Sequence, residues 1–184
     1  MVCMRVWTRL LISLVVMAPL PATTLEQLTL DDMIQKSTAI VRARVTGSHS
    51  GYLGANRGAG IYTYFQLQVL ETWKSSGQAT TEVAVPGGVV DGIRQSVAGA
   101  PALKPGQEYV LFLWTSRSGL TQVIGLSQGV FNISEEGSGG GVAKRPAASE
   151  LMLNASGLPV EDRPLSIQVQ DLRARVLQAL GAAK

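Results

Sequence analysis

The feature that most constrains the fold of this chain is an apolar run at residues 109–114, Tyr-Val-Leu-Phe-Leu-Trp. A Pro-Gly turn at residues 105–106 leads into the run, and a polar loop at residues 115–119 follows it. A strand that is apolar on both faces must be covered on both faces. The run therefore predicts the central strand of a sheet or of a closed barrel.

Residues 1–22 have the pattern of a secretory signal peptide. Arg5 and Arg9 precede an apolar segment at residues 10–20, and Ala22 offers a small residue for cleavage. This segment is shorter than the roughly 20 residues that span a bilayer, so we favour cleavage over a retained N-terminal anchor, which stays the alternative. We expect a secreted or periplasmic protein with no stable membrane span after cleavage.

Composition limits the chemistry that the rest of the chain can carry. The single cysteine, Cys3, lies in the predicted signal, so the mature chain would have neither disulfides nor cysteine chemistry. The 16 Lys and Arg against 13 Asp and Glu are nearly balanced once Arg5 and Arg9 are removed with the signal. Without a basic stripe we expect no nucleic-acid partner. The chain has one histidine, and its adjacent carboxylates lack the alternating spacing of a calcium-binding loop. We therefore expect no bound metal ion and no cofactor.

Local patterns predict a short helix, several strands and a C-terminal helix. Thr29 and Asp32 have capping-box spacing at the start of a short helix that ends near Ser37. The alternation of apolar residues breaks at Leu70, which predicts a bulge in that strand. Strands are predicted at residues 39–45, 61–74, 83–85, 109–114, 122–126 and 129–133. Loops are predicted at residues 46–60 and 134–150, and a long, partly ordered excursion at residues 87–106.

The tail has a different periodicity from the rest of the chain. Apolar residues recur at helical spacing behind Ser166, the predicted N-cap. We therefore expect a signal at residues 1–22, one domain at residues 23–163 that includes a flexible loop at 134–150, and an amphipathic helix at residues 164–184. No long helices separate the strands, so a small, bent, mainly antiparallel barrel is expected instead of a parallel sheet. The helical face consists of Leu165, Val169, Leu172, Val176 and Leu180.

Three segments share a layout with a known group of modules. They are STAIVRARV at residues 37–45, IYTYFQLQVLETWKSSG at residues 61–77, and KPGQEYVLFLW at residues 104–114. This layout resembles the netrin-like modules, which include the tissue inhibitors of metalloproteinases, and secreted bacterial proteins of the same pattern. The resemblance implies a five-stranded OB-like barrel and makes an exported protease a candidate partner. Those inhibitors chelate the protease zinc through an N-terminal cysteine, which the mature chain lacks, so their mechanism is not carried over.

Two serines give an alternative, catalytic interpretation. Residues 125–129, Gly-Leu-Ser-Gln-Gly, match the G-x-S-x-G nucleophile elbow, but a strand pattern follows Ser127 and no histidine comes after it. His49, Asp91 and Ser138 occur in the order of the catalytic residues of chymotrypsin-like proteases. The mature chain, however, is short for the two barrels of that fold. We predict no catalytic residues. A serine hydrolase that uses Ser127 or Ser138 with His49 is the alternative.

The candidate binding surface consists of Tyr52, Tyr62 and Tyr64. They lie at or beside the predicted glycine-rich loop, where outward-facing aromatic rings would form a contact site. Of the two arrangements we favour the one in which the C-terminal helix covers these tyrosines, because that helix needs an apolar partner. We expect an exported, non-catalytic binding or accessory module with a protein, as yet unknown, as its partner.

Overall fold

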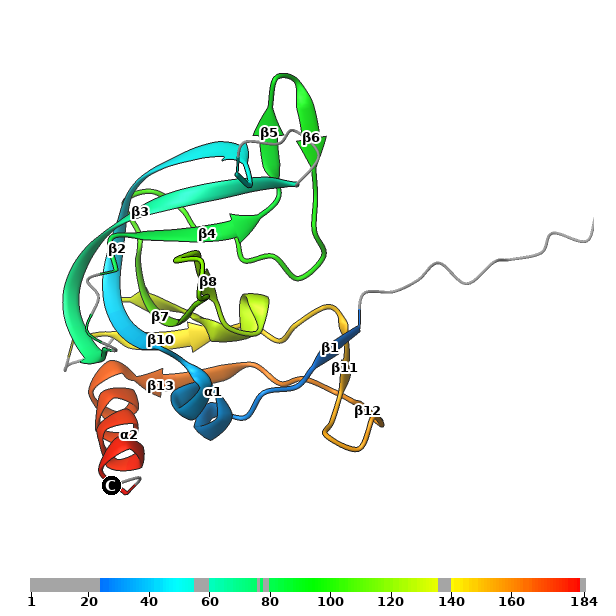
Figure 1. Cartoon of the computed structure of the whole chain (residues 1–184). Helices are drawn as coiled ribbons and strands as arrows, with labels where there is room; N and C mark the ends of the chain where they lie inside the picture. Colours follow the sequence, from blue (N-terminus) through cyan, green and yellow to red (C-terminus); the bar gives the residue numbers. More distant parts are fainter. Residues whose placement is uncertain (1–23, 55–59, 76, 78–79, 136–139, 183–184) are drawn as a thin grey trace, which may run out of the picture.

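A computed structural model describes residues 24–54, 60–75, 77, 80–135 and 140–182 of the chain (Figure 1). The predicted signal and its cleavage site lie outside these residues. Two helices, a short 3-10 helix and thirteen strands are described. They are β1 (Thr24–Glu26), α1 (Leu30–Lys36), β2 (Ala39–Tyr52), β3 (Ile61–Lys74), β4 (Glu82–Pro86), β5 (Gly88–Val90), β6 (Ile93–Gln95), β7 (Glu108–Thr115), β8 (Thr121–Val123), η1 (Leu126–Gly129), β9 (Val130–Ser134), β10 (Val142–Arg145), β11 (Leu151–Leu153), β12 (Pro159–Val160), β13 (Leu165–Gln168) and α2 (Val169–Gly181).

Five of the strands close into a barrel (Figure 1). β2 pairs with β3 and with β7, β3 with β4, and β7 with β8, all antiparallel. A parallel pairing of β4 with β8 completes the circle. This is the Greek-key arrangement of an OB-like barrel. The prediction of a mainly β chain with such a barrel, a short N-terminal helix and a C-terminal helix is confirmed.

Strand β7 supplies both of the apolar cores. Tyr109, Leu111 and Leu113 point into the barrel, whereas Val110 and Phe112 point to the opposite side. On that side α1, α2 and β9 cover the strand, and the rings of Phe112 and Phe131 lie 5.6 Å apart. The central position predicted for the run is thus confirmed for residues 109–113, while Trp114 is 44% exposed. The second core also includes Met33, Ile34, Ile40, Trp73, Ala143, Val169, Leu172 and Val176.

One edge of β7 is divided between two partners. Residues Leu113–Thr115 pair with β8, and residues Tyr109–Leu111 pair with β9 after the chain has turned through η1. β9, β10 and β13 then extend the sheet away from the barrel, and α2 follows directly from β13. In the described part of the chain, neither helix has the length and apolar character needed to cross a bilayer.

The long strands β2 and β3 bend around the barrel through irregularities in their pairing. Arg42 faces Glu71 and Ala43 faces Val69, so Leu70 is the extra residue of a bulge, as predicted. The prediction of a loop at residues 46–60 is wrong for residues 46–52, which continue β2. Its glycines are sites of close packing within this strand pair: a Cβ at Gly47 would lie 3.1 Å from Gln66 Oε1.

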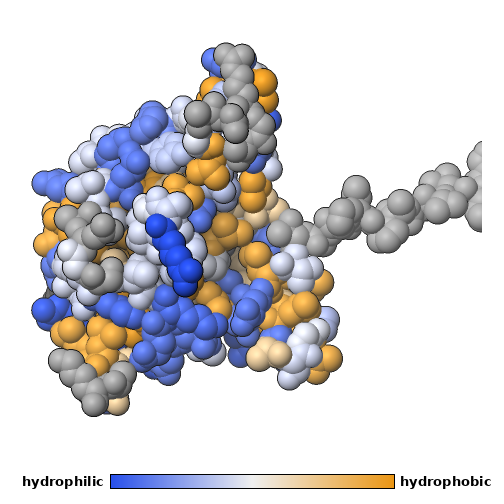
Figure 2. Space-filling view, viewed as in Figure 1, coloured by the Kyte–Doolittle hydropathy of each residue, from blue (hydrophilic) through white to orange (hydrophobic). Residues whose placement is uncertain are grey.

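Strand pairing adds detail to one prediction and corrects two others. Within the partly ordered excursion expected at residues 87–106, β5 and β6 form a hairpin that projects from the barrel and exposes Val89 and Ile93 (Figures 1 and 2). Within the predicted flexible loop at 134–150, β10 is a strand. The tail enters β13 before it becomes helical, because residues 165–168 pair with β10. α2 therefore begins at Val169 with Gln168 as N-cap, and Ser166 is not its cap.

A buried glutamine fastens the N-terminal segment to the barrel. Gln128 in η1 is 2% exposed, and both ends of its amide are used. Its Oε1 accepts a hydrogen bond from the Leu28 amide at 2.8 Å, and its Nε2 donates one to the Glu26 carbonyl at 3.0 Å. The side chain of Gln128 thereby joins the segment between β1 and α1 to the turn between β8 and β9.

A buried ion pair fixes the connection between β10 and β13. Arg145 Nη1 lies 2.6 Å from Asp162 Oδ2, and the two side chains are 8% and 4% exposed. Asp162 also accepts a hydrogen bond from the Ala148 amide. Burial opposes ionisation of Asp162, but these hydrogen bonds and the arginine charge outweigh it and hold the pKa of the carboxyl below its usual value.

We expect this pair to make stability fall in acid. A carboxyl whose pKa is lower in the folded state contributes stability at neutral pH and loses it as the pH drops below about 4. Asp162→Asn should lower the free energy of unfolding at neutral pH by about 3–5 kcal/mol, because it leaves Arg145 buried without its charge partner, and should flatten the acid dependence. Urea unfolding between neutral and acid pH measures both effects.

The matched control is Glu161→Gln, since Glu161 is the adjacent, exposed carboxylate. It should change stability by less than about 0.5 kcal/mol. An Asp162→Asn variant with the wild-type stability and acid dependence would contradict the role given to the pair.

Candidate functional site

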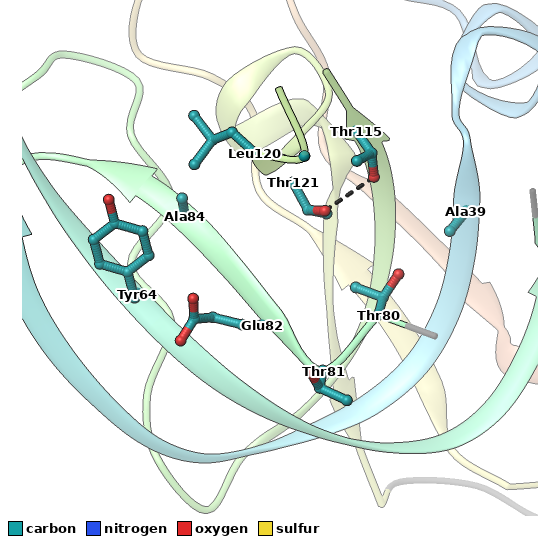
Figure 3. Close-up of a pocket in the computed structure, with 10 residues that line it drawn as sticks. Ala39, Tyr64, Thr80, Thr81, Glu82, Ala84, Thr115, Leu120 and Thr121 are labelled. Carbon is teal, nitrogen blue, oxygen red and sulfur yellow. Dashed lines mark hydrogen bonds between the residues drawn. The ribbon is translucent and has the colours of Figure 1, made fainter. Parts of the chain in front are cut away.

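The barrel wall is weakest between β4 and β8. These strands share the single residue pair Ala84 and Gln122, whereas β3 and β4 stay paired from Tyr62 to Gln66. A groove of about 460 Å³ opens along this seam (Figure 3). We call it the seam groove. Its polar lining consists of Tyr64, Thr80, Thr81, Glu82, Thr115 and Thr121.

The seam groove crosses the barrel wall from its outer face to one end of its interior. Tyr64 and Glu82 belong to the outer face of β3 and β4, because the residues that alternate with them, Phe65 and Val83, are in the barrel core. At the other side, Thr115 and Thr121 continue the inward rows of Leu113 and Val123. Their hydroxyl oxygens share a hydrogen bond of 2.9 Å. The groove therefore joins an aromatic wall outside to hydroxyl groups inside.

A stack of two rings fixes the aromatic wall. His49 and Tyr64 are directly paired in β2 and β3, with ring centroids 5.2 Å apart and an angle of 17° between the rings. Gly51 flanks His49 on the same face, and a Cβ there would meet the Tyr64 ring at 3.7 Å. The strand thus keeps small residues where the tyrosine lies across it. The orientation of Tyr64 is set within the protein, before any ligand binds.

Gln66 links the ring stack to Glu82. Its Nε2 lies 3.0 Å from His49 Nδ1 and donates to Glu82 Oε2 at 3.3 Å. An amide nitrogen only donates, so His49 Nδ1 serves here as the acceptor. Burial raises the pKa of Tyr64 above its usual value, and the negative charge of Glu82 and the neighbouring Tyr62 add to the effect. His49, Gln66 and Glu82 are therefore joined by hydrogen bonds across β2, β3 and β4.

Of the three predicted tyrosines, two share the outer face. Tyr62 and Tyr64 alternate with buried residues of β3, and both are half-buried. Tyr52 pairs with the buried Ile61, so the register places it on the opposite face from Tyr62. The favoured arrangement, in which α2 covers the tyrosines, is wrong, because α2 packs in the second core with Trp73. The surface of Tyr62 and Tyr64 remains open at that side.

The residues of the catalytic alternative are not brought together among the described residues. Ser127 lies in η1, where its amide donates to the Gly99 carbonyl at 3.0 Å, and no hydrogen bond joins it to His49. Asp91 lies at the tip of the β5–β6 hairpin, and Ser138 lies outside the described residues. Backbone conformation and close packing explain why glycines flank Ser127. Gly125 adopts a left-handed φ of 60°, and a Cβ at Gly129 would lie 2.6 Å from the Ile124 carbonyl oxygen.

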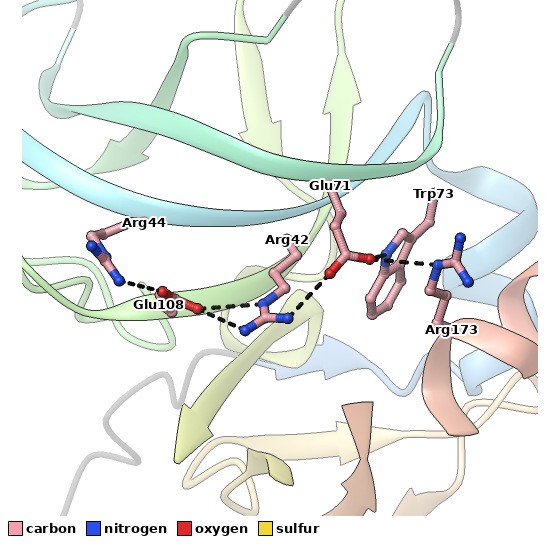
Figure 4. A network of polar contacts seen from close by, with 6 residues as sticks. All are labelled: Arg42, Arg44, Glu71, Trp73, Glu108 and Arg173. Carbon is pink, nitrogen blue, oxygen red and sulfur yellow. Dashed lines mark hydrogen bonds and ion pairs between the residues drawn. The ribbon is translucent and has the colours of Figure 1, made fainter. Parts of the chain in front are cut away.

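A second polar cluster joins β2, β3, β7 and α2 (Figure 4). Arg42 pairs with Glu71 at 3.1 Å and with Glu108 at 3.0 Å, and Glu108 also pairs with Arg44. Glu71 further accepts a hydrogen bond from Trp73 Nε1 and lies 3.5 Å from Arg173 Nε. The Trp73 hydrogen bond, with Arg42, holds the pKa of Glu71 below its usual value. The cluster satisfies its own charges and ties α2 to the barrel.

Apart from Tyr64, the residues of the seam groove carried no signal that could be read in the sequence. Thr80, Thr115 and Thr121 belong to separate segments, and only closure of the barrel brings them together. The described residues hold no group of three or more His, Cys, Asp or Glu placed to bind a metal ion. A comparison with known protein families finds no match, and a search of curated proteins finds no related sequence. The fold and the groove thus define the class of this protein: a small OB-like barrel with a ligand-sized groove in its wall.

The electrostatic link between Glu82 and Tyr64 can be measured. We expect Glu82→Gln to lower the pKa of Tyr64 towards that of a free tyrosine, because the nearby negative charge that disfavours tyrosinate is removed. Part of the elevation should remain, since burial is its largest cause. Titration of the tyrosine rings by nuclear magnetic resonance, with Tyr64→Phe to assign the signal, follows this change.

Asp171→Asn is the control for the titration, because this exposed carboxylate lies on α2 and does not line the groove. It should leave the Tyr64 titration unchanged. An unchanged titration in Glu82→Gln as well would mean that the two side chains do not lie as described.

Proposed function

We propose that this chain is an exported, non-catalytic binding module that holds its ligand in the seam groove and against Tyr64. The observation that carries the proposal is a groove of about 460 Å³, a volume within the range of roughly 300–1,000 Å³ that is typical of small-ligand sites. The aromatic ring of Tyr64 and the hydroxyl-bearing residues Thr80, Thr81, Thr115 and Thr121 line this groove. An aromatic wall combined with a few polar groups is typical of a binding site.

The position of the groove supports the same proposal. OB barrels bind ligands across their second and third strands and the adjoining loops. Here those strands are β3 and β4, and the loop between β7 and β8 borders the groove. The likeness to netrin-like modules and the signal pattern agree with export and with a binding role. His49 stacks on Tyr64 and contacts Gln66, so it supports a tyrosine that lines the groove.

A capture experiment tests the proposal. The chain from Thr23 onward is immobilised and exposed to an extracellular or periplasmic fraction, beside Tyr64→Ala and Trp114→Ala. Trp114 is an exposed aromatic residue that does not line the groove. We expect the wild type and Trp114→Ala to retain the same material, and Tyr64→Ala to retain at least tenfold less. The retained material is then analysed for protein and for carbohydrate.

Two results would contradict the proposal. Equal retention by folded samples of all three baits, checked by circular dichroism, would show that the groove is not the binding site. Covalent labelling of the wild type by a fluorophosphonate probe, lost on Ser127→Ala, would favour the serine hydrolase.

A further inference from the structure

We infer that copies of this chain associate with one another, and that the β5–β6 hairpin of one copy packs into an apolar groove beside Trp114 of the next. The inference goes beyond the proposed function, because this groove shares no residue with the seam groove. It follows from two apolar features of the described chain, one that projects and one that is hollow.

The projecting feature is the hairpin of β5 and β6 (Figures 1 and 2). Val90 pairs with Ile93 on one face of the hairpin, and Val89 pairs with Arg94 on the other. Val89 is 46% exposed and Ile93 is 58% exposed. The turn at residues 91–92 has φ values of 50° and 78°, the pattern of a tight two-residue hairpin turn. A hairpin with apolar side chains on both faces is covered on both faces only when it lies in a groove.

The hollow feature is a groove of about 370 Å³, which we call the Trp114 groove. Its apolar lining consists of Leu25, Leu28, Trp114, Val123, Ile124 and Leu126. Trp114 is 44% exposed, so a large part of the indole is in contact with water in a single copy. Leu126 adopts a φ of 56°, a conformation that bulky residues rarely adopt. The fold therefore holds this leucine in the groove lining despite backbone strain, as is often found at binding sites.

The hairpin and the Trp114 groove also match in reach and in charge. Each strand of the hairpin has three residues, which at about 3.4 Å per residue gives a projection of about 10 Å. Arg94 is exposed beside Val89, and the groove is bordered by Glu26, whose side chain is 65% exposed. The pairing of Glu26 with Lys36 is loose, at 3.8 Å. A cation on the hairpin and a carboxylate at the groove favour one direction of packing.

A second copy is the occupant that brings both features together. An apolar projection that complements a hollow elsewhere on the same surface makes a head-to-tail contact between identical chains. Such contacts close into a ring or a reciprocal pair, or continue as an open chain. The association removes Ile93, Val89 and the exposed part of Trp114 from water, which is its driving force. The polar turn at residues 91–92 stays in water where the hairpin extends past the groove.

The test uses the chain from Thr23 onward, in which Trp114 reports on its own groove. This chain has two tryptophans, and Trp73 is already buried. Sedimentation velocity and tryptophan emission are measured together as the protein concentration is raised from about 1 µM to about 1 mM, the range expected for a small interface. We expect association, a shift of the emission to shorter wavelength and protection of Trp114 from acrylamide quenching, all with the same midpoint.

Single variants assign the contact to its two sides. Ile93→Ser keeps Trp114 but should weaken association at least tenfold and remove the emission shift over this range, because an anchor of the contact is lost. Trp114→Ala should weaken association by a similar factor. The matched control is Leu158→Ser, since Leu158 is 61% exposed and lies between β11 and β12. It should change the midpoint by less than about twofold. Circular dichroism checks that each variant is folded.

A mixing experiment distinguishes hairpin-in-groove packing from two like surfaces that face each other. The Ile93→Ser chain has an intact groove, and the Trp114→Ala chain has an intact hairpin. Adding the second chain to the first should restore the emission shift, which comes from the groove of the first. A double variant with both Ile93→Ser and Trp114→Ala should restore nothing.

Three results would overturn the inference. The first is a wild type that stays monomeric with unchanged emission up to about 1 mM, a concentration that would detect even weak association. The second is association that Ile93→Ser leaves intact, or mixed chains that do not restore the shift. The third is a shift of Trp114 emission on addition of phosphatidylcholine and phosphatidylglycerol vesicles but not on a rise in protein concentration, which would assign the groove to lipid.

Discussion

The rest of the structure depends on the burial of both faces of β7. Because Leu111 and Leu113 point one way and Val110 and Phe112 the other, the strand cannot lie at any surface of the molecule. One face of β7 is buried because β2, β3, β4 and β8 close with it into a barrel. The other face is covered by α1, α2 and β9. The two cores are therefore not independent units, since β7 contributes side chains to both of them.

This arrangement determines which surface stays open. α2 is held by the second core and by the pairing of Arg173 with Glu71, so it covers the end of β3 at Trp73 and not the segment with Tyr62 and Tyr64. β8 is a short strand because β7 shares the same edge with β9, and β8 therefore meets β4 at one residue pair. The seam groove is a consequence of these two facts. The groove thus lies where the barrel is least completely closed.

Local physical chemistry made much of the fold predictable. The capping box was visible in the spacing of Thr29 and Asp32, and the structure shows both of its hydrogen bonds. Apolar alternation located β3, and its interruption located the bulge at Leu70. The continuous apolar run at residues 109–114 located β7. These signals act within one strand or one helical turn, so no knowledge of partners was needed.

The predictions that failed depended on partners far away in sequence. Gly47 and Gly51 have the composition of a loop, but Gln66 and Tyr64 from the neighbouring strand occupy the space beside them. Residues 165–168 have a helical pattern, but pairing with β10 holds them extended. The threonines of the groove are ordinary strand residues one by one. Only closure of the barrel brings them together in one groove.

The central claim is that the barrel closes between β4 and β8 by one residue pair and leaves a groove there. Amide hydrogen exchange, read residue by residue, tests this claim most directly, because it reports how firmly each strand pairing is held. The structure predicts the slowest exchange in β2 and β7, faster exchange in β4 and β8, and a direct nuclear Overhauser contact between the backbones of Ala84 and Gln122. Equal protection of all five strands, or the absence of that contact, would contradict the account.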